Sequence, residues 1–124
     1  AVTSLNPHGE TFEGKDIEKT EILPAIKILK KKKIKVLGPF SADTVFLKEN
    51  RRKFNIIVGM YHDQVLGPMK TIFGFDAINI TIGLPFVRIT PDHGPNYKMF
   101  GLNKSNPDSL IQAFSFLNKY AIKA

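Results

Sequence analysis

The sequence has no cysteine, no apolar run that approaches the length of a membrane helix, and no signal-peptide pattern at its start. Without cysteine there are no disulfides and no thiolate metal ligands, which fits a reducing compartment. A helix that crosses a bilayer needs about 20 consecutive apolar residues, so no membrane partner is expected. A secretory signal would begin with basic and then apolar residues. These absences predict a cytoplasmic protein.

The first residue is not methionine, and Ala1–Leu5 already has the pattern of a strand body. We therefore expect residues 1–124 to be a fragment of a longer chain. A content of 43% hydrophobic and 23% charged residues argues against wholesale disorder. The length is enough for one region with its own core, although it is short for an enzyme with two substrates.

The net charge is +7, and much of it is concentrated in Lys30–Lys33 and Lys35, at the end of a predicted helix. Lysines at this position complement the negative end of the helix dipole. No aromatic residues alternate with this cluster and no known nucleic-acid-binding motif accompanies it, so no nucleic-acid partner is expected. The positive field instead suits a small phosphorylated substrate.

Strand-like and helical segments alternate along the chain, which predicts an α/β fold with a three-layer α/β/α sheet. Pro24 interrupts the first helical pattern and predicts a kink or two short helices. Asn106 and Pro107 are the residue types expected at a helix N-cap and at the first helical position. The predicted strands are residues 2–5, 34–37, 55–60, 77–82 and 86–89; the predicted helices are residues 16–32, 62–73 and 107–122, with a short helical or irregular stretch from 41 to 44.

One predicted strand, residues 55–60, leads directly into Tyr61-His62-Asp63-Gln64. Its apolar run predicts a strand buried on both faces. A turn of small residues would normally follow, but an imidazole, a carboxylate and an amide follow instead. Since ligands of open α/β sheets bind outside the carboxyl ends of the strands, this segment is predicted to bring reactive groups to a site.

The three histidines, His8, His62 and His93, all lie in loops rich in other functional groups. Imidazole binds divalent transition metals and exchanges protons near neutral pH. Two imidazoles cannot complete a tetrahedral zinc site, so a further ligand would have to come from elsewhere. By spacing alone, a metal site and a surface or structural role for each histidine both remain open.

Lys70, Asn79 and Arg88 form a second group of candidates. Lysine and arginine bind phosphate and carboxylate groups. Asn79 is predicted to lie inside an apolar strand, where an unsatisfied amide would cost a few kcal/mol. A hydrogen bond from Asn79 to a neighbouring loop is the simpler alternative. The chain has no Gly-x-Gly-x-x-Gly and no Walker loop, so a nucleotide would bind by a different route, with residues 93–107 as the candidate loop.

Five motifs together resemble the 4-hydroxythreonine-4-phosphate dehydrogenase family, and specifically the C-terminal part of its subunit. The resemblance implies a partial fold of the isocitrate and isopropylmalate dehydrogenase type. It also implies an NAD(P)-dependent oxidative decarboxylation in pyridoxal 5′-phosphate biosynthesis. The motifs are Asn-Pro-His-Gly-Glu at 6–10, Gly-Pro-Phe-Ser-Ala-Asp-Thr at 38–44, Met-Tyr-His-Asp-Gln at 60–64, Asn-Ile-Thr-Ile-Gly-Leu-Pro-Phe-Val-Arg at 79–88 and Asp-His-Gly at 92–94.

The same resemblance implies a role for each candidate. His8 and His62 are implied ligands of a divalent metal (Zn, Mg or Co), with a third histidine upstream of this chain. The active site is implied to be shared in a homodimer, with His62 acting in the partner's site. The implied substrate contacts are Lys70, Asn79 and Arg88, the implied catalytic residues are Asp43, Asp63 and Lys70, and the implied cofactor contacts are His93, Gly94, Lys98 and Asn106.

Lys98 departs from the family pattern, which usually has an aspartate there for the ribose hydroxyls of NAD. A cation fits the 2′-phosphate of NADP better. Two alternatives to the predicted activity remain: a related dehydrogenase acting on another phosphorylated hydroxy acid, or a truncated, inactive chain that only binds or dimerises.

Overall fold

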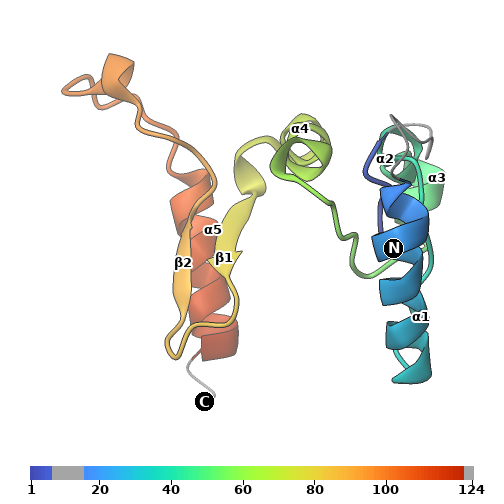
Figure 1. Ribbon diagram of the computed structural model, residues 1–124. Helices are drawn as coiled ribbons and strands as arrows, with labels where there is room; N and C mark the ends of the chain where they lie inside the picture. The colour runs from blue at the N-terminus through green and yellow to red at the C-terminus, as the bar shows by residue number, and fades with distance from the viewer. Residues whose placement is uncertain (7–15, 122–124) are drawn as a thin grey trace. The chain divides into compact units, whose positions relative to one another are not determined.

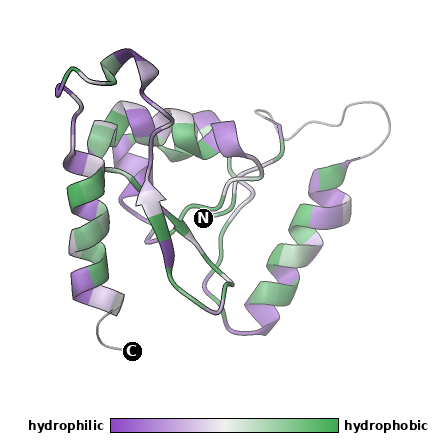
Figure 2. Ribbon diagram, turned by 90° about the vertical axis from the view of Figure 1, so that its left-hand side faces the viewer, coloured by the Kyte–Doolittle hydropathy of each residue, from purple (hydrophilic) through white to green (hydrophobic). Residues whose placement is uncertain are grey.

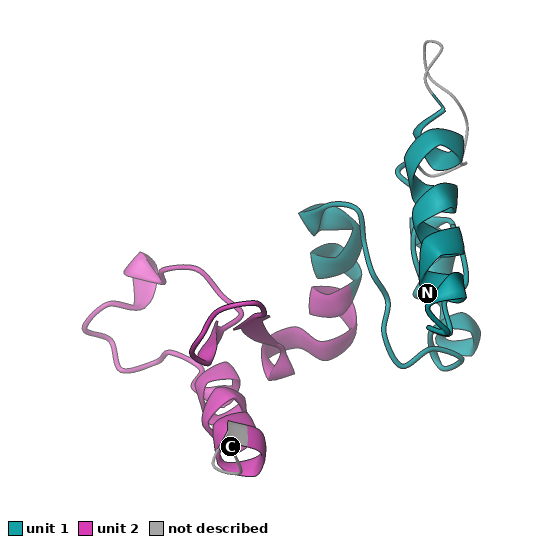
Figure 3. Cartoon of the chain, turned by 60° about the horizontal axis from the view of Figure 1, so that its bottom comes forward, with its two compact units in different colours: residues 1–68 teal, residues 69–124 magenta. Residues whose placement is uncertain are grey.

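The computed structural model describes residues 1–6 and 16–121 (Figure 1). The chain divides into two compact units, Ala1–Pro68 and Met69–Ala124, here called unit 1 and unit 2 (Figure 3). Both contain helices together with extended, paired segments, which confirms a mixed α/β chain. No helix among the described residues has both the length and the apolar character needed to cross a membrane.

Three extended segments meet at the centre of unit 1. Residues 1–4 lie between residues 37–40 and residues 56–58, and the pairing is parallel on both sides. The predicted strands 2–5, 34–37 and 55–60 are wrong as continuous strands, because each neighbouring segment contributes only an isolated bridge. The amides of Val2, Thr3 and Ser4 donate to the carbonyls of Leu37, Val58 and Phe40, over 2.9, 2.9 and 2.7 Å.

The predicted helix 16–32 is built as two pieces. A π-helical turn, η1 (Glu18–Ile22), continues directly into the α-helix α1 (Leu23–Lys31). Pro24 lies in the first turn of α1, directly after η1, so the predicted division into two helical pieces at Pro24 is confirmed. Both hydrophobic and hydrophilic residues occur along α1 (Figure 2). Its apolar side packs into a cluster made of Val2, Ile22, Ile26 and Val36, with Leu5, Leu29 and Met60 against it.

The prediction that residues 55–60 form a strand buried on both faces is wrong for this chain. Ile56 is 71% exposed and Val58 is 47% exposed. Val58 pairs with Val2 along one edge, and both Ile56 and Val58 line an open hollow instead of a packed interior. An apolar run reports that a segment will be covered, but it does not say whether the covering residues belong to the same chain.

Two short helices follow in unit 1, α2 (Ala42–Val45) and α3 (Lys48–Arg51), and α4 (His62–Phe73) begins in unit 1 and ends in unit 2. The predicted short helical stretch at 41–44 and the predicted helix 62–73 are confirmed. Pro68 lies inside α4 and immediately precedes the boundary between the units.

Unit 2 consists of an antiparallel hairpin and a helix. After the short turn η2 (Gly74–Asp76), β1 (Ile78–Thr81) pairs with β2 (Arg88–Pro91), and α5 (Asp108–Phe116) packs against both strands. The predicted strand 77–82 is confirmed, whereas the strand predicted at 86–89 begins two residues later. Two further turns are η3 (Tyr97–Met99) and the π-helical η4 (Leu117–Ala121).

Asn79 lies inside β1, as predicted, but it is exposed, so the expected cost of burying its amide does not arise in this chain. Only the two strands β1 and β2 form a sheet among the described residues. Asn79 therefore lies in a two-stranded ribbon, where water can satisfy its amide.

Candidate functional site

His62 and Asp63 begin α4 and contact each other directly. Nδ1 of His62 lies 2.8 Å from Oδ1 of Asp63, and the two side chains are 74% and 88% exposed. Since a carboxylate only accepts hydrogen bonds, Nδ1 donates, and in the neutral imidazole the other ring nitrogen, Nε2, presents a lone pair. A carboxylate that orients an imidazole in this way is common behind metal-binding histidines.

Asp63 also lies close to Asp43, the second predicted acidic residue. Both line a small cavity of about 270 Å³, together with Ala42, Tyr61, Gln64 and Pro68. The hydroxyl of Ser41 donates to Asp43 at 2.7 Å, which fixes this carboxylate at the start of α2. The structure thus brings the two acidic candidates of unit 1 to one hollow next to His62.

In unit 2, Lys70 forms an ion pair with Asp92. Nζ of Lys70 lies 3.2 Å from Oδ2 of Asp92, and the lysine side chain is 39% exposed. Asp92 is held in turn by Ser109 of α5, whose hydroxyl accepts from the Asp92 amide at 2.9 Å and donates to the carbonyl of Ala77 at 2.5 Å. The ammonium of Lys70 is therefore positioned by residues at the ends of both strands.

Asn79 and Arg88 lie on the same face of the hairpin. The register pairs Asn79 with Thr90 and Thr81 with Arg88, and alternate residues of a strand share a face. Nη1 of Arg88 donates to the hydroxyl of Thr81 at 2.7 Å, which directs the guanidinium across the ribbon. This face carries two groups that can bind oxyanions or carbonyls.

The predicted cofactor residues are spread over the loop between β2 and α5. His93 is exposed and its Nδ1 donates to the carbonyl of Gly94 at 3.1 Å. Lys98 is exposed in η3. Asn106 accepts from the amide of Asp108 at 2.7 Å, so its side chain does bind the start of α5, although the N-cap residue is Pro107, one position later than predicted. The structure brings no other cofactor candidate into contact with Lys98 or Asn106.

His8 lies outside the described residues. Within residues 1–6 and 16–121, no group of three or more His, Cys, Asp or Glu side chains is arranged to hold a metal ion. His62 with its carboxylate partner fits one metal ligand, and a complete coordination sphere needs donors beyond this described set.

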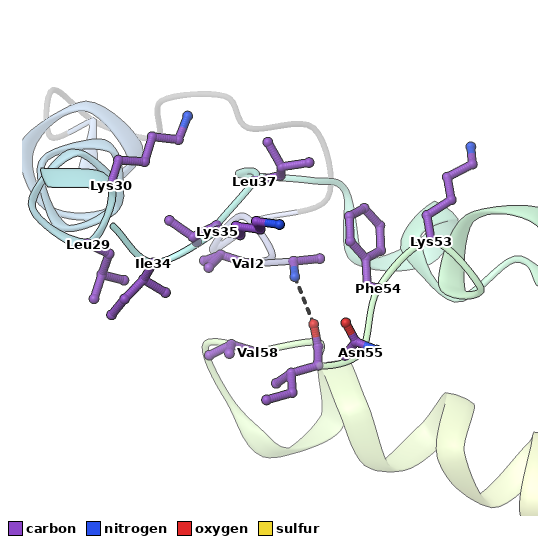
Figure 4. A pocket seen from close by; sticks show the side chains of 13 residues that line it. Val2, Leu29, Lys30, Ile34, Lys35, Leu37, Lys53, Phe54, Asn55 and Val58 are labelled. Atoms are coloured by element: carbon purple, nitrogen blue, oxygen red, sulfur yellow. Dashed lines mark hydrogen bonds between the residues drawn. The ribbon is translucent and has the colours of Figure 1, made fainter. Parts of the chain in front are cut away.

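A larger, mainly apolar hollow of about 770 Å³ lies elsewhere in unit 1 and contains none of the predicted site residues. Figure 4 shows Leu29, Ile34 and Val58 around it, with the ammonium groups of Lys30 and Lys53 at its rim. Because its lining is mainly apolar, this hollow is suited to packing against another surface more than to catalysis.

Four residues that organise the site were missed at the level of sequence: Glu18, Gln64, Asp92 and Ser109. Gln64 and Asp92 lay within recognised motifs, but nothing in the pattern distinguished a buried, bonded side chain from a reactive one. Ser109 begins a small-residue pair with Ala113 at helical spacing, and both are buried in α5. That pair was the available signal.

Comparison with known proteins places these features in one family. The family described as "pyridoxal phosphate biosynthetic protein PdxA" matches residues 1–117. A relative named 4-hydroxythreonine-4-phosphate dehydrogenase, from Bradyrhizobium diazoefficiens, is 45% identical over 122 residues, which are 98% of this chain and 35% of the relative. One of the same name from Sulfurihydrogenibium sp. is 45% identical over 115 residues, 91% of this chain and 35% of the relative.

Solved structures agree with the sequence matches. The 4-hydroxythreonine-4-phosphate dehydrogenase of Klebsiella pneumoniae is 33% identical, with a TM-score of 0.74 over 95% of this chain and 36% of its own. That of Burkholderia phymatum is 38% identical, with a TM-score of 0.67 over 90% of this chain and 34% of its own. This chain thus spans about a third of the length of the relatives it matches. The family match covers nearly all of this chain, and the chain belongs to the PdxA family of pyridoxal phosphate biosynthetic proteins.

Proposed function

We propose that this chain forms part of an NAD(P)-dependent enzyme that oxidises and decarboxylates 4-hydroxythreonine 4-phosphate. The observation that carries the proposal is its 45% identity, over 98% of its length, to a relative of that name. The grouping of the candidate residues supports it: an imidazole–carboxylate pair with a second carboxylate nearby in unit 1, and two cations with an amide in unit 2.

The cations of unit 2 would hold the anionic groups of the substrate. Arg88 is exposed and oriented by Thr81, so its fork of N–H donors suits a phosphate or a carboxylate. Asn79 on the same face adds a donor and an acceptor for a hydroxyl group. Lys70 would move from Asp92 to the bound substrate, because a dianionic phosphate competes with a single carboxylate for its ammonium.

The acidic residues of unit 1 would handle protons and orient His62. Asp63 holds the imidazole, and Asp43 lies across the small cavity. A divalent metal, held by His8 of one subunit and His62 of the other, with further donors from outside this chain, would supply Lewis acidity that polarises the substrate's hydroxyl oxygen. Imidazole donors suit Zn or Co, and Mg would need oxygen donors from outside this chain.

The cofactor would bind the loop that contains His93, Gly94, Lys98 and Asn106. Lys98 is exposed in η3, where its cation can reach a 2′-phosphate, so we propose that NADP is accepted. Rates with NAD and NADP, measured for the unaltered protein and for Lys98→Asp, test this. A strong NAD preference that Lys98→Asp leaves unchanged would contradict it.

The complete protein would form a three-layer α/β/α subunit of the isocitrate dehydrogenase type, and two subunits would share the active site. Large exposed hydrophobics in both units support a covering partner surface, among them Ile56 (71%), Ile82 (93%) and Phe100 (91%).

The test is turnover of 4-hydroxythreonine 4-phosphate by the protein expressed from its own gene, followed as formation of reduced cofactor. Arg88→Met should raise KM at least tenfold, because it removes a cation from a phosphate or carboxylate. Lys27→Met, at an exposed lysine of α1, is the matched control and should leave KM unchanged. Turnover of a different phosphorylated hydroxy acid alone, or of no substrate at all, would overturn the proposal in favour of one of the two alternatives.

A further inference from the structure

Gln64 is buried in the first turn of α4 and uses every hydrogen-bonding position of its side chain. It is 6% exposed. Its Oε1 accepts from the hydroxyl of Thr3 and from the amide of Met60, both at 2.7 Å. Its Nε2 donates to the carbonyls of Ser4 at 2.7 Å and Leu5 at 3.2 Å. One side-chain amide thus joins the start of α4 to the central extended segment of unit 1.

Only an amide satisfies this set of partners. The carbonyls of Ser4 and Leu5 can only accept, and the Met60 amide can only donate, so both a donor and an acceptor are needed at the end of one side chain. A glutamate of the same shape would place a carboxylate oxygen against two carbonyl oxygens. An apolar side chain would leave buried polar groups without partners.

The segment that Gln64 contacts is fixed from a second side by Glu18 of η1. The Leu5 amide donates to Oε1 of Glu18 at 2.9 Å, and the Asn6 amide approaches the same oxygen at 3.4 Å. Glu18 is itself 5% exposed. The anchor that Gln64 holds is therefore itself held by a buried side chain from a different helix.

His62 and Asp63 depend on this anchor because they have little packing of their own. Both side chains are largely exposed, and they lie two residues (His62) and one residue (Asp63) before Gln64 in the same helical turn. Gln64 also lines the cavity that contains Asp63 and Asp43. The position of the imidazole–carboxylate pair is therefore set by how this first turn of α4 is attached to the rest of unit 1.

We propose that Gln64 is the positioning residue of the His62–Asp63 pair: its buried amide locks the first turn of α4 onto Thr3–Leu5 and so sets where the imidazole presents Nε2. The inference rests on the proposed metal-binding role of His62. Residues that orient metal ligands typically change metal affinity about 10- to 100-fold when they are altered.

The experiment is a cobalt(II) titration of the protein expressed from its own gene, below its unfolding temperature, with affinity read from the visible absorption of the bound ion. Gln64→Glu should weaken cobalt binding about 10- to 100-fold. Amide exchange at Leu5 should become faster in the same variant, which reports that the anchor has loosened. Gln112→Glu adds the same charge at an exposed position of α5 and should leave both readouts unchanged.

The outcomes separate this inference from the proposed function. If His62→Ala abolishes cobalt binding while folded Gln64→Glu binds as tightly as the unaltered protein, the positioning role is wrong and the metal role stands. If His62→Ala leaves cobalt affinity unchanged, the metal role fails and the positioning role fails with it. Should Gln64→Glu not fold, Thr3→Val, which removes one of the four bonds, replaces it: weaker binding supports the inference, and unchanged binding overturns it.

Discussion

Units 1 and 2 are held together by different means. Unit 1 buries branched and aromatic side chains, whereas the described residues of unit 2 bury only two alanines as hydrophobic core. Each unit also connects separate segments through buried polar side chains, among them Gln64 in unit 1 and Ser109 in unit 2. The buried hydrophobics of unit 1 are Val2, Ile22, Ile26, Val36, Val45 and Phe46; those of unit 2 are Ala77 and Ala113.

The difference shows which part of the chain depends on other surfaces. Unit 2 leaves Ile82, Phe100 and Tyr97 at 93%, 91% and 83% exposure, and burying a side chain of this size contributes about 1.5–3 kcal/mol. A region of its length with so small a core is marginal alone. The relatives it matches are about three times as long as this chain, so they have residues that could cover these side chains. The proposed substrate residues therefore lie in the unit that gains most from being covered.

The largest effect is expected from Gly38→Ala, which attacks unit 1 alone. Gly38 has a φ of +137°, and an added Cβ would overlap the carbonyl oxygen of Val2, next to the central backbone bonds. Strain and overlap together should cost about 2–4 kcal/mol of unfolding free energy. Urea denaturation with amide exchange would measure it. Loss of protection in unit 2 to the same extent would show that the effect of the change is not confined to unit 1.

The next largest effect is expected from Ser109→Ala, which attacks unit 2 alone. The change leaves the buried carbonyl of Ala77 without its donor and the part-buried amide of Asp92 without its acceptor. An unsatisfied buried group costs about 1–3 kcal/mol. Ser115→Ala, at an exposed position of the same helix, is the control and should cost little. Equal losses from the two variants, measured by thermal unfolding, would show that the buried hydroxyl does not hold the hairpin to α5.

Some elements of both units could be predicted from the sequence and others could not. Helix α4 and strand β1 were predictable, because His62–Phe73 and Ile78–Thr81 have strong local patterns and need no distant partner to form. The continuous strands of unit 1 were not, because a strand is defined by its neighbours and the segment at Val58 has only one. The predicted burial of Ile56 was wrong for the same reason, because its segment has a paired neighbour on one side only.

For the site, sequence motifs located His62, Asp63 and Asp43, and the structure brings them together. The motifs could not reveal that Gln64, one residue further on, is buried and fully bonded. Which member of a motif reacts and which one anchors depends on contacts from residues about 60 positions away in the sequence, as in the bonds from Gln64 to Ser4 and Thr3.

A smaller effect, of opposite sign, is expected from Gly67→Ala. Gly67 lies in the middle of α4 and has no positive φ, and an added Cβ would meet no atom within 4 Å outside its two chain neighbours and the backbone of α4 itself. Alanine should stabilise this helix by about 0.5–1 kcal/mol. Thermal unfolding would detect the gain, which contrasts with the loss at Gly38. A destabilisation at Gly67 would mean that α4 needs the freedom of glycine before Pro68.

The smallest change in stability is expected from Thr81→Val, which tests whether the polar face of the hairpin serves binding more than folding. The substitution removes the hydroxyl that receives Nη1 of Arg88, while valine keeps the shape and a high strand propensity. A cross-strand pair at an exposed site contributes about 0.2–1 kcal/mol, so unfolding should shift by about 0.5 kcal/mol or less. Substrate KM should nevertheless rise severalfold, because the guanidinium loses the contact that orients it. Thr90→Val, on the same face but not bonded to Arg88, should leave KM closer to that of the unaltered protein. A large loss of stability with an unchanged KM would reverse the assignment and make the Arg88–Thr81 bond part of what holds unit 2 together.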